Sequence, residues 1–96
     1  MTYEEFKTKY PVGSQGRRNF MLLTGFSEAI STFVNNDILN GDLIFDLMGN
    51  LGWRKAGPIV KGLRKEANYS RLFENYEHFV KGYGKWDKEN PKKVSD

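Results

Sequence analysis

The sequence contains no cysteine, and this absence excludes disulfide bonds, thiolate metal ligands and cysteine nucleophiles. It contains a single histidine, His78, so little is present for general acid–base chemistry near neutral pH. No apolar run approaches the ~20 residues that a membrane-spanning helix needs. The first residues, Met1–Glu5, do not resemble a secretion signal. We therefore expect a cytoplasmic protein without a membrane span.

The chain has 96 residues, enough for one domain, and aromatic residues make up 15% of it. Most of the net charge of +3 comes from the C-terminal end, where five lysines (Lys81, Lys85, Lys88, Lys92 and Lys93) outnumber three acids (Asp87, Glu89 and Asp96). We expect a helical domain over residues 1–84 and a lysine-rich, flexible tail over residues 85–96. Because acids separate the lysines, a solvated tail is favoured over a phosphate-binding one.

Local signals predict helices over about residues 2–10, 15–36, 40–48, 53–67 and 70–81. Thr2 and Glu5 have the spacing of a capping box, and Asn40 or Asp42 can cap the third helix. Strand-like alternation is absent. The prediction is an all-α fold, a small bundle of four to five helices with short connections.

Apolar residues at helical spacing predict which faces form the core. In residues 15–36 these are Leu22 or Leu23, Phe26, Ile30, Phe33 and Val34. Residues 40–48 are apolar on more than one side, so we expect this helix to be a buried crosspiece. Gly57-Pro58 predicts a kink or a fresh helix start, and Gly82 with Gly84 predicts the end of the last helix.

The order of several short motifs resembles a family of short helical bacterial and phage proteins of unknown function. The motifs are Asn19-Phe20, Asp42–Gly49, Trp53, Pro58-Ile59, Leu63–Glu66 and Leu72–Glu77. The resemblance covers about residues 17–80. It implies a helical fold, and it implies no activity, ligand or functional residue.

Basic side chains form the first candidate binding site. On the predicted helix 53–67 they lie opposite the apolar stripe, and two more lie at the start of helix 15–36. The candidates for contact with phosphate or an acidic partner are Arg17, Arg18, Arg54, Lys55, Lys61 and Lys65. An ordinary solvated helix face is nevertheless the favoured interpretation, because every amphipathic helix on a bundle surface needs a polar outer side.

Candidate reactive groups are few. His78 lies near Glu74 and Glu77, but a solvated surface histidine is favoured over an acid–base pair, because general-base catalysis also needs a pocket and a second positioned group. Asp42 and Asp46 are four residues apart, and stabilisation of a helix start explains Asp42 without a metal. We expect no catalytic residue, metal or cofactor. We also expect Arg64 to form an ion pair with Glu74 or Glu77 that sets the register of two helices.

The sequence contains enough apolar residues for a core, surplus aromatic residues and no assembled reactive site. Together these features favour a non-enzymatic helical module that binds another protein, as an adaptor or inhibitor. Tyr83 and Trp86, with three further tyrosines (Tyr3, Tyr10 and Tyr69), are candidates for an aromatic contact patch. Self-association into a homo-oligomer is a further expectation. The alternative function is an accessory protein that binds nucleic acid through the basic helix face and the tail.

Overall fold

A computed structural model describes residues 1–91 and contains five helices and no strand over that range. The helices are α1 (Tyr3–Lys9), α2 (Gln15–Asn35), α3 (Gly41–Met48), α4 (Trp53–Ala67) and α5 (Glu74–Glu89). The predicted all-α class is confirmed, and the first four helices begin within about a residue of their predicted positions.

Three helices begin at side-chain caps. The Thr2 hydroxyl accepts from the Glu5 amide, and the Glu5 carboxylate accepts from the Thr2 amide, which completes the predicted capping box of α1. Ser14 caps α2, and Asn40 caps α3 by accepting from the Leu43 amide at 3.1 Å. Each cap satisfies a backbone amide that the helix itself leaves unpaired.

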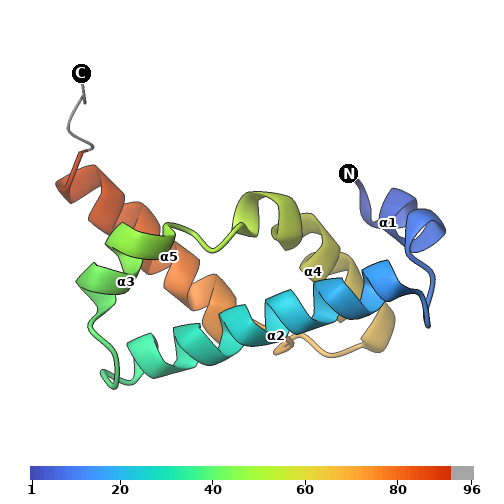
Figure 1. The fold of residues 1–96 in the computed structure, drawn as a ribbon, viewed down its shortest axis with the longest axis horizontal. Coiled ribbons are helices and arrows are strands. Elements are labelled where there is room, and N and C mark those ends of the chain that lie inside the picture. Colours follow the sequence, from blue (N-terminus) through green and yellow to red (C-terminus); the bar gives the residue numbers. More distant parts are fainter. Residues whose placement is uncertain (92–96) are drawn as a thin grey trace.

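The longest helix, α2, packs along α5, while α1 packs on α4 at one end and α3 packs on α5 at the other (Figure 1). The shortest dimension of the molecule is 20 Å. That is about two helix diameters, so most helices have one side in contact with a neighbour and one side in solvent.

Two groups of core residues involve α5, and the buried Phe6 of α1 and Ile59 of α4 lie outside both groups. Val60, Phe73 and Tyr76 form the first, which Trp53 joins with its ring centroid 4.9 Å from that of Tyr76. In the second, Phe45 of α3 lies 4.9 Å from the buried Phe79 ring. The buried aromatic residues of α5 therefore hold α3 and α4 on the same helix.

The last helix differs from its prediction at both ends. It starts at Glu74 after Phe73, which is in the left-handed region with φ of 57°, and not at Ser70. It continues through Gly82 and Gly84 to Glu89, so the predicted end at Lys81 is wrong. Residues 85–89, predicted as tail, are helical. The predicted tail lysines Lys92 and Lys93 lie outside the described residues.

Helix α4 passes through Gly57-Pro58 without interruption, so no fresh helix starts there. Pro58 lacks the amide that would bond to the Arg54 carbonyl, which lies on an exposed part of the first turn. A Cβ at Gly57 would come within 2.9 Å of the Trp53 ring. Glycine at this position therefore lets the Trp53 ring lie against the helix that carries it.

Two predicted core faces lie in solvent. The buried residues of α2 are Thr24, Ser27 and Ser31. Of the predicted core residues of this helix, Leu22, Leu23, Phe26 and Phe33 are exposed, and Ile30 and Val34 are partly buried. Helix α3 contains no buried residue, so its predicted role as a buried crosspiece is wrong. Because the molecule is about two helices thick, neighbouring helices cover only one face of each helix. The covered face of α2 is its polar face, and the apolar face lies in solvent.

Candidate protein-binding surface

The predicted basic site is divided between two helices. Arg17 is partly buried, with its guanidinium 5.1 Å from the Phe6 ring centre and a hydrogen bond to the Tyr10 carbonyl. Arg18 is exposed and donates to the Gly13 carbonyl at 2.7 Å. Both therefore stabilise the connection between α1 and α2.

The basic residues of α4 are more available. Arg54, Lys55, Lys61 and Lys65 are all exposed. None of them forms an ion pair with a carboxylate within residues 1–91. All four belong to one helix, so the predicted site is not assembled from several elements.

The predicted interhelical ion pair is present. An Arg64 guanidinium nitrogen lies 2.7 Å from a Glu77 carboxylate oxygen, and the Arg64 Nε donates to the Leu72 carbonyl. The hydrogen bond from Arg64 holds the pKa of Glu77 below its ordinary value. Glu74 pairs with Arg71 instead. The His78 side chain forms no hydrogen bond within the described chain, so neither carboxylate is paired with the histidine there.

The predicted aromatic contact residues pack within the molecule. The rings of Tyr83 and Trp86 lie 5.9 and 5.8 Å from that of Phe45, and both side chains are half-buried. They hold the C-terminal turns of α5 against α3. Tyr69, by contrast, is 51% exposed.

Helix α2 has two opposite faces with different chemistry. Thr24, Ser27 and Ser31 recur every three or four residues and are buried against the rest of the fold. About 180° around the helix, Leu22, Phe26, Ala29 and Phe33 recur with the same spacing and are exposed. Small inward residues allow α5 to approach closely, and they leave the large apolar residues outside.

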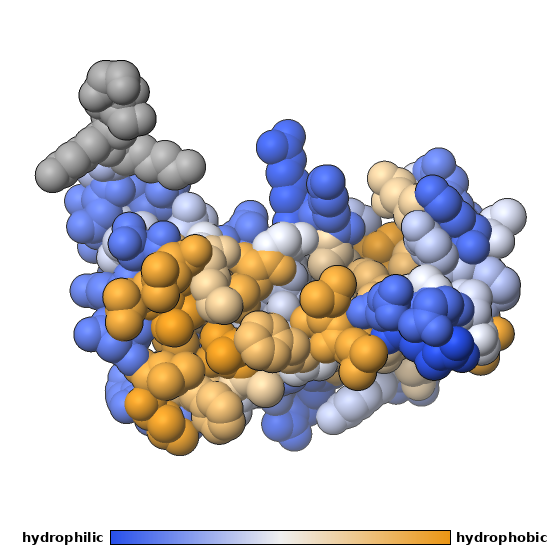
Figure 2. All heavy atoms as spheres, in the orientation of Figure 1, coloured by the Kyte–Doolittle hydropathy of each residue, from blue (hydrophilic) through white to orange (hydrophobic). Residues whose placement is uncertain are grey.

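The exposed apolar side chains of α2 continue over the following loop and α3. We call this set the outer apolar surface; its members are Leu22, Leu23, Phe26, Phe33, Ile38, Leu43, Leu47 and Met48, each at least 40% exposed. Figure 2 shows apolar side chains gathered over α2 and α3 on one face of the molecule. Proteins that act alone rarely expose an apolar patch larger than a few hundred Å². This surface is therefore the candidate contact site of the described chain.

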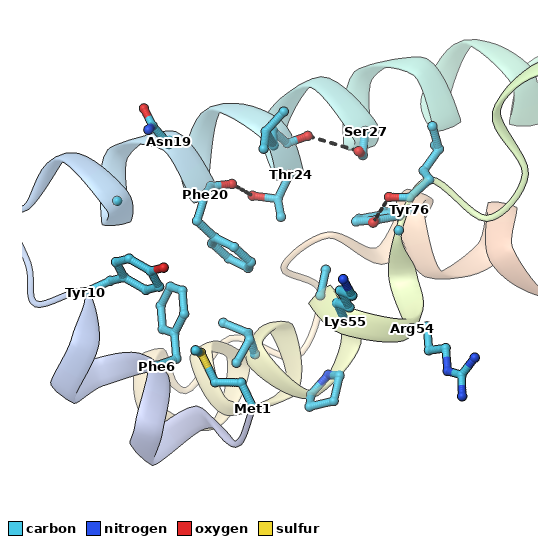
Figure 3. A pocket seen from close by; sticks show the side chains of 17 residues that line it. Met1, Phe6, Tyr10, Asn19, Phe20, Thr24, Ser27, Arg54, Lys55 and Tyr76 are labelled. Carbon is cyan, nitrogen blue, oxygen red and sulfur yellow. Dashed lines mark hydrogen bonds between the residues drawn. The ribbon is translucent and has the colours of Figure 1, made fainter.

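A pocket of about 990 Å³ adjoins this surface between α1, α2 and α4. Figure 3 shows Phe6 and Phe20 directed toward the same space, while Arg54 points away from it. Leu23 belongs both to the pocket and to the outer apolar surface. The residues that line the pocket include no Asp, Glu or His, so it offers apolar contact and no general acid or base for neutral pH.

Sequence reasoning detects the apolar stripe of α2 and assigns it to the core. The signal that separates the two faces is the second stripe of Thr24, Ser27 and Ser31, which has the same period. Small hydroxyl residues at this spacing fit a closely packed helix pair, because each hydroxyl can bond to its own helix. The Thr24 and Ser27 hydroxyls do so, at 2.9 Å from the carbonyls of Phe20 and Leu23.

The described residues contain neither a cluster of metal-ligand side chains nor a helix that could span a membrane. Nowhere in residues 1–91 do three His, Asp or Glu side chains come together as metal ligands would. In the same range no helix combines the length and the apolar character required to cross a bilayer.

The comparison with protein families gives one match. The sequence model of a family described as "Domain of unknown function (DUF4760)" matches residues 2–86. The chain belongs to the DUF4760 family. This confirms the resemblance to a family of unknown function and extends it from residues 17–80 to nearly the whole described chain. No curated protein and no solved structure matches the chain.

Proposed function

We propose that this member of the DUF4760 family is a non-enzymatic helical module that binds protein through the outer apolar surface of α2 and α3. The single observation that carries the proposal is the exposure of the apolar stripe of α2, with Leu22 72% and Phe26 53% exposed. Exposed leucine and phenylalanine at helical spacing are the elements of helix-mediated recognition. The cytoplasm is the proposed place of action, and an adaptor or inhibitor is the proposed type of role.

The size of the surface supports a stable contact. Leucine and phenylalanine side chains bury on the order of 100 Å² each when they are covered, so the eight residues offer roughly 800 Å². A specific protein–protein interface buries about 800 Å² on each partner. The outer apolar surface thus has the extent of one ordinary interface.

Site-specific photocrosslinking tests the proposal. Benzoylphenylalanine in place of Phe26 would lie in the surface, and the same group in place of Lys61 would lie on the exposed polar side of α4. Irradiation in cells of the native host should give covalent protein adducts at position 26 and few at position 61. Equal or no adduct formation at the two positions would refute the proposed function.

The alternative function, nucleic-acid binding, is favoured by the four exposed basic residues of α4 that lack an ion-pair partner in residues 1–91. Its expected signature is affinity for DNA or RNA that falls steeply with added salt. The charge-reversing pair Arg54→Glu and Lys61→Glu should weaken such binding, and Phe26→Ser should not. Failure to bind nucleic acid at low salt would remove this alternative.

A further inference from the structure

We infer that the pocket between α1, α2 and α4 binds a small amphiphile with one carboxylate and an unbranched alkyl chain, as in a fatty acid. This site goes beyond the proposed function and does not depend on it, because that function concerns protein contact at the outer apolar surface. Three features of the pocket support such a ligand. The pocket is long, its wall is apolar, and the charged side chains that line it are basic.

The pocket follows one face of α2. Its lining on that helix is formed by residues that recur every three or four positions, from Gly16 to Ser27. At ~1.5 Å per residue, these two ends lie roughly 16 Å apart along the helix. The volume of about 990 Å³ is at the upper end of the range for small-molecule sites. An extended alkyl chain has this shape, whereas one protein side chain would fill only a small part of the space.

The wall of the pocket is apolar in its chemistry even where it carries hydroxyl groups. The Thr24 and Ser27 hydroxyls donate to carbonyls of their own helix, and the Tyr76 hydroxyl donates to a backbone carbonyl before α4. These three donors therefore need no acceptor on a ligand. The Phe6 and Phe20 rings, whose centroids lie 4.7 Å apart, add aromatic surface on the side of α1. Methylene groups can therefore be buried along this wall.

The charge at the pocket is positive. Its charged side chains are Arg54 and Lys55, and the lining contains no Asp, Glu or His. Figure 3 shows that Arg54 points away from the space, whereas Lys55 lies at the end near Tyr76, far from Phe6 and Tyr10. Lys55 forms no ion pair within residues 1–91. One ammonium group at the end of an apolar pocket matches one carboxylate at the end of an alkyl chain.

These positions define how the ligand would lie. The carboxylate is placed beside Lys55, and the alkyl chain extends along α2 toward Phe20 and Phe6. Lys55 is exposed, so the carboxylate keeps water on its outer side while the chain is covered. Burial of an unpaired charge, which would be costly, is thereby avoided.

Calorimetric titration of the full chain with decanoate tests the site. We expect one saturable site per chain, weaker binding of decanol, and the weakest binding of decyltrimethylammonium, which has the same alkyl chain and the opposite charge. From octanoate through decanoate to dodecanoate, the dissociation constant should fall roughly fourfold for each added methylene. Absence of saturable decanoate binding, or equal binding of the anion and the cation, would overturn the inference.

Two lysines of α4 give a matched pair of variants for the head group. Lys55→Glu reverses the charge at the pocket, and Lys61→Glu makes the same change on an exposed residue outside the pocket lining. We expect the first to raise the dissociation constant of decanoate roughly tenfold, and the second to change it by less than about twofold. Equal effects would show that decanoate responds only to net charge, which would overturn the inference.

Two neighbouring leucines give a second matched pair, for the alkyl chain. Leu22 and Leu23 both belong to the outer apolar surface, but only Leu23 also lines the pocket. Leu23→Asp should raise the dissociation constant of decanoate roughly tenfold, because it places a negative charge beside the alkyl chain, and Leu22→Asp should not. Both residues are exposed, so both variants should fold, which circular dichroism checks. Equal weakening would show that decanoate spreads over the outer apolar surface, and the pocket would be excluded as its site.

Photocrosslinking at position 26 and titration with decanoate give independent results. Protein adducts at position 26 without decanoate binding would support the proposed function and overturn the fatty-acid site. Decanoate binding that depends on Lys55 and Leu23, without such adducts, would support the fatty-acid site and refute the proposed function.

Discussion

The carboxylate of Glu28, in the middle of α2, accepts a hydrogen bond from the backbone amide of Tyr76 at 2.8 Å. Its second oxygen accepts from the Asn75 side chain at 2.9 Å. Tyr76 is in the first turn of α5, whose own preceding residue, Phe73, provides no side-chain cap. Glu28 therefore caps a helix that begins far along the chain from it, and it places a negative charge at that helix N-terminus.

Replacement of Glu28 should show the value of this cap. We expect Glu28→Ala to lower the free energy of unfolding by about 1–2 kcal/mol, the usual cost of a lost N-cap. Glu28→Gln keeps an oxygen that can accept from Tyr76 and should lose less. Urea denaturation measures both. Equal losses for the two variants would show that the hydrogen bond to Tyr76 contributes nothing.

The Arg64–Glu77 pair predicts a dependence of stability on pH. The pKa of Glu77 is lowered from 4.5 in the folded protein, chiefly by the hydrogen bond from Arg64. A lowered folded pKa stabilises the fold above the unfolded value, and this contribution is lost as the pH falls through the folded value. Glu77→Gln should therefore reduce the free energy of unfolding at pH 7 by roughly 1–2 kcal/mol. It should also make that free energy fall less steeply as the pH becomes acidic. Thermal melts from neutral to strongly acidic pH measure this, and an unchanged slope in the variant would contradict it.

Ser31 is fully buried, and its hydroxyl has no hydrogen-bond partner. An unpaired buried hydroxyl is costly, and alanine is the better helix former. We expect Ser31→Ala to raise the free energy of unfolding by roughly 1 kcal/mol. Ser27→Ala is the matched control. The Ser27 hydroxyl donates to the Leu23 carbonyl, so its removal should raise the free energy of unfolding by less. Destabilisation by Ser31→Ala would contradict the unpaired state of this hydroxyl.

Two helical glycines should respond in opposite directions to alanine. A Cβ at Gly62 would collide with the Tyr3 ring of α1, whereas a Cβ at Gly84 has nothing within 4 Å. Gly84→Ala should stabilise by about 0.5–1 kcal/mol through helix propensity alone. Gly62→Ala should displace α1 from α4 and cost roughly 1–3 kcal/mol. Hydrogen exchange of α1 amides, combined with denaturation, measures both effects, and a gain at Gly62 would show that α1 docks differently.

Much of the fold can be predicted because its signals are local. The caps Thr2 and Asn40 mark the starts of α1 and α3, and apolar residues at helical spacing mark α2 and α4. The start of α5 cannot be predicted in this way, because its cap comes from Glu28 on another helix. The helix also extends past its predicted end, because packing of Trp86 on Phe45 outweighs the weak helix propensity of the two glycines before it.

The candidate site is harder to predict than the fold. Periodicity shows that α2 has an apolar face, but the identity of the covered face depends on which neighbour packs there. Thr24, Ser27 and Ser31 are the buried residues of α2, which packs mainly on α5, and the apolar face therefore lies outside. The Arg64–Glu77 pair can be predicted because Arg64 borders the apolar stripe of its own helix, beside the helix that carries Glu77.

The two tryptophans lie in different parts of the core. Trp53 packs on Tyr76 near the start of α5, and Trp86 packs on Phe45 near its end. Each indole is thus a fluorescent reporter for one half of the molecule. Chains that keep one tryptophan and carry phenylalanine at the other position would reveal whether the α3 half and the α4 half melt at one temperature or in succession.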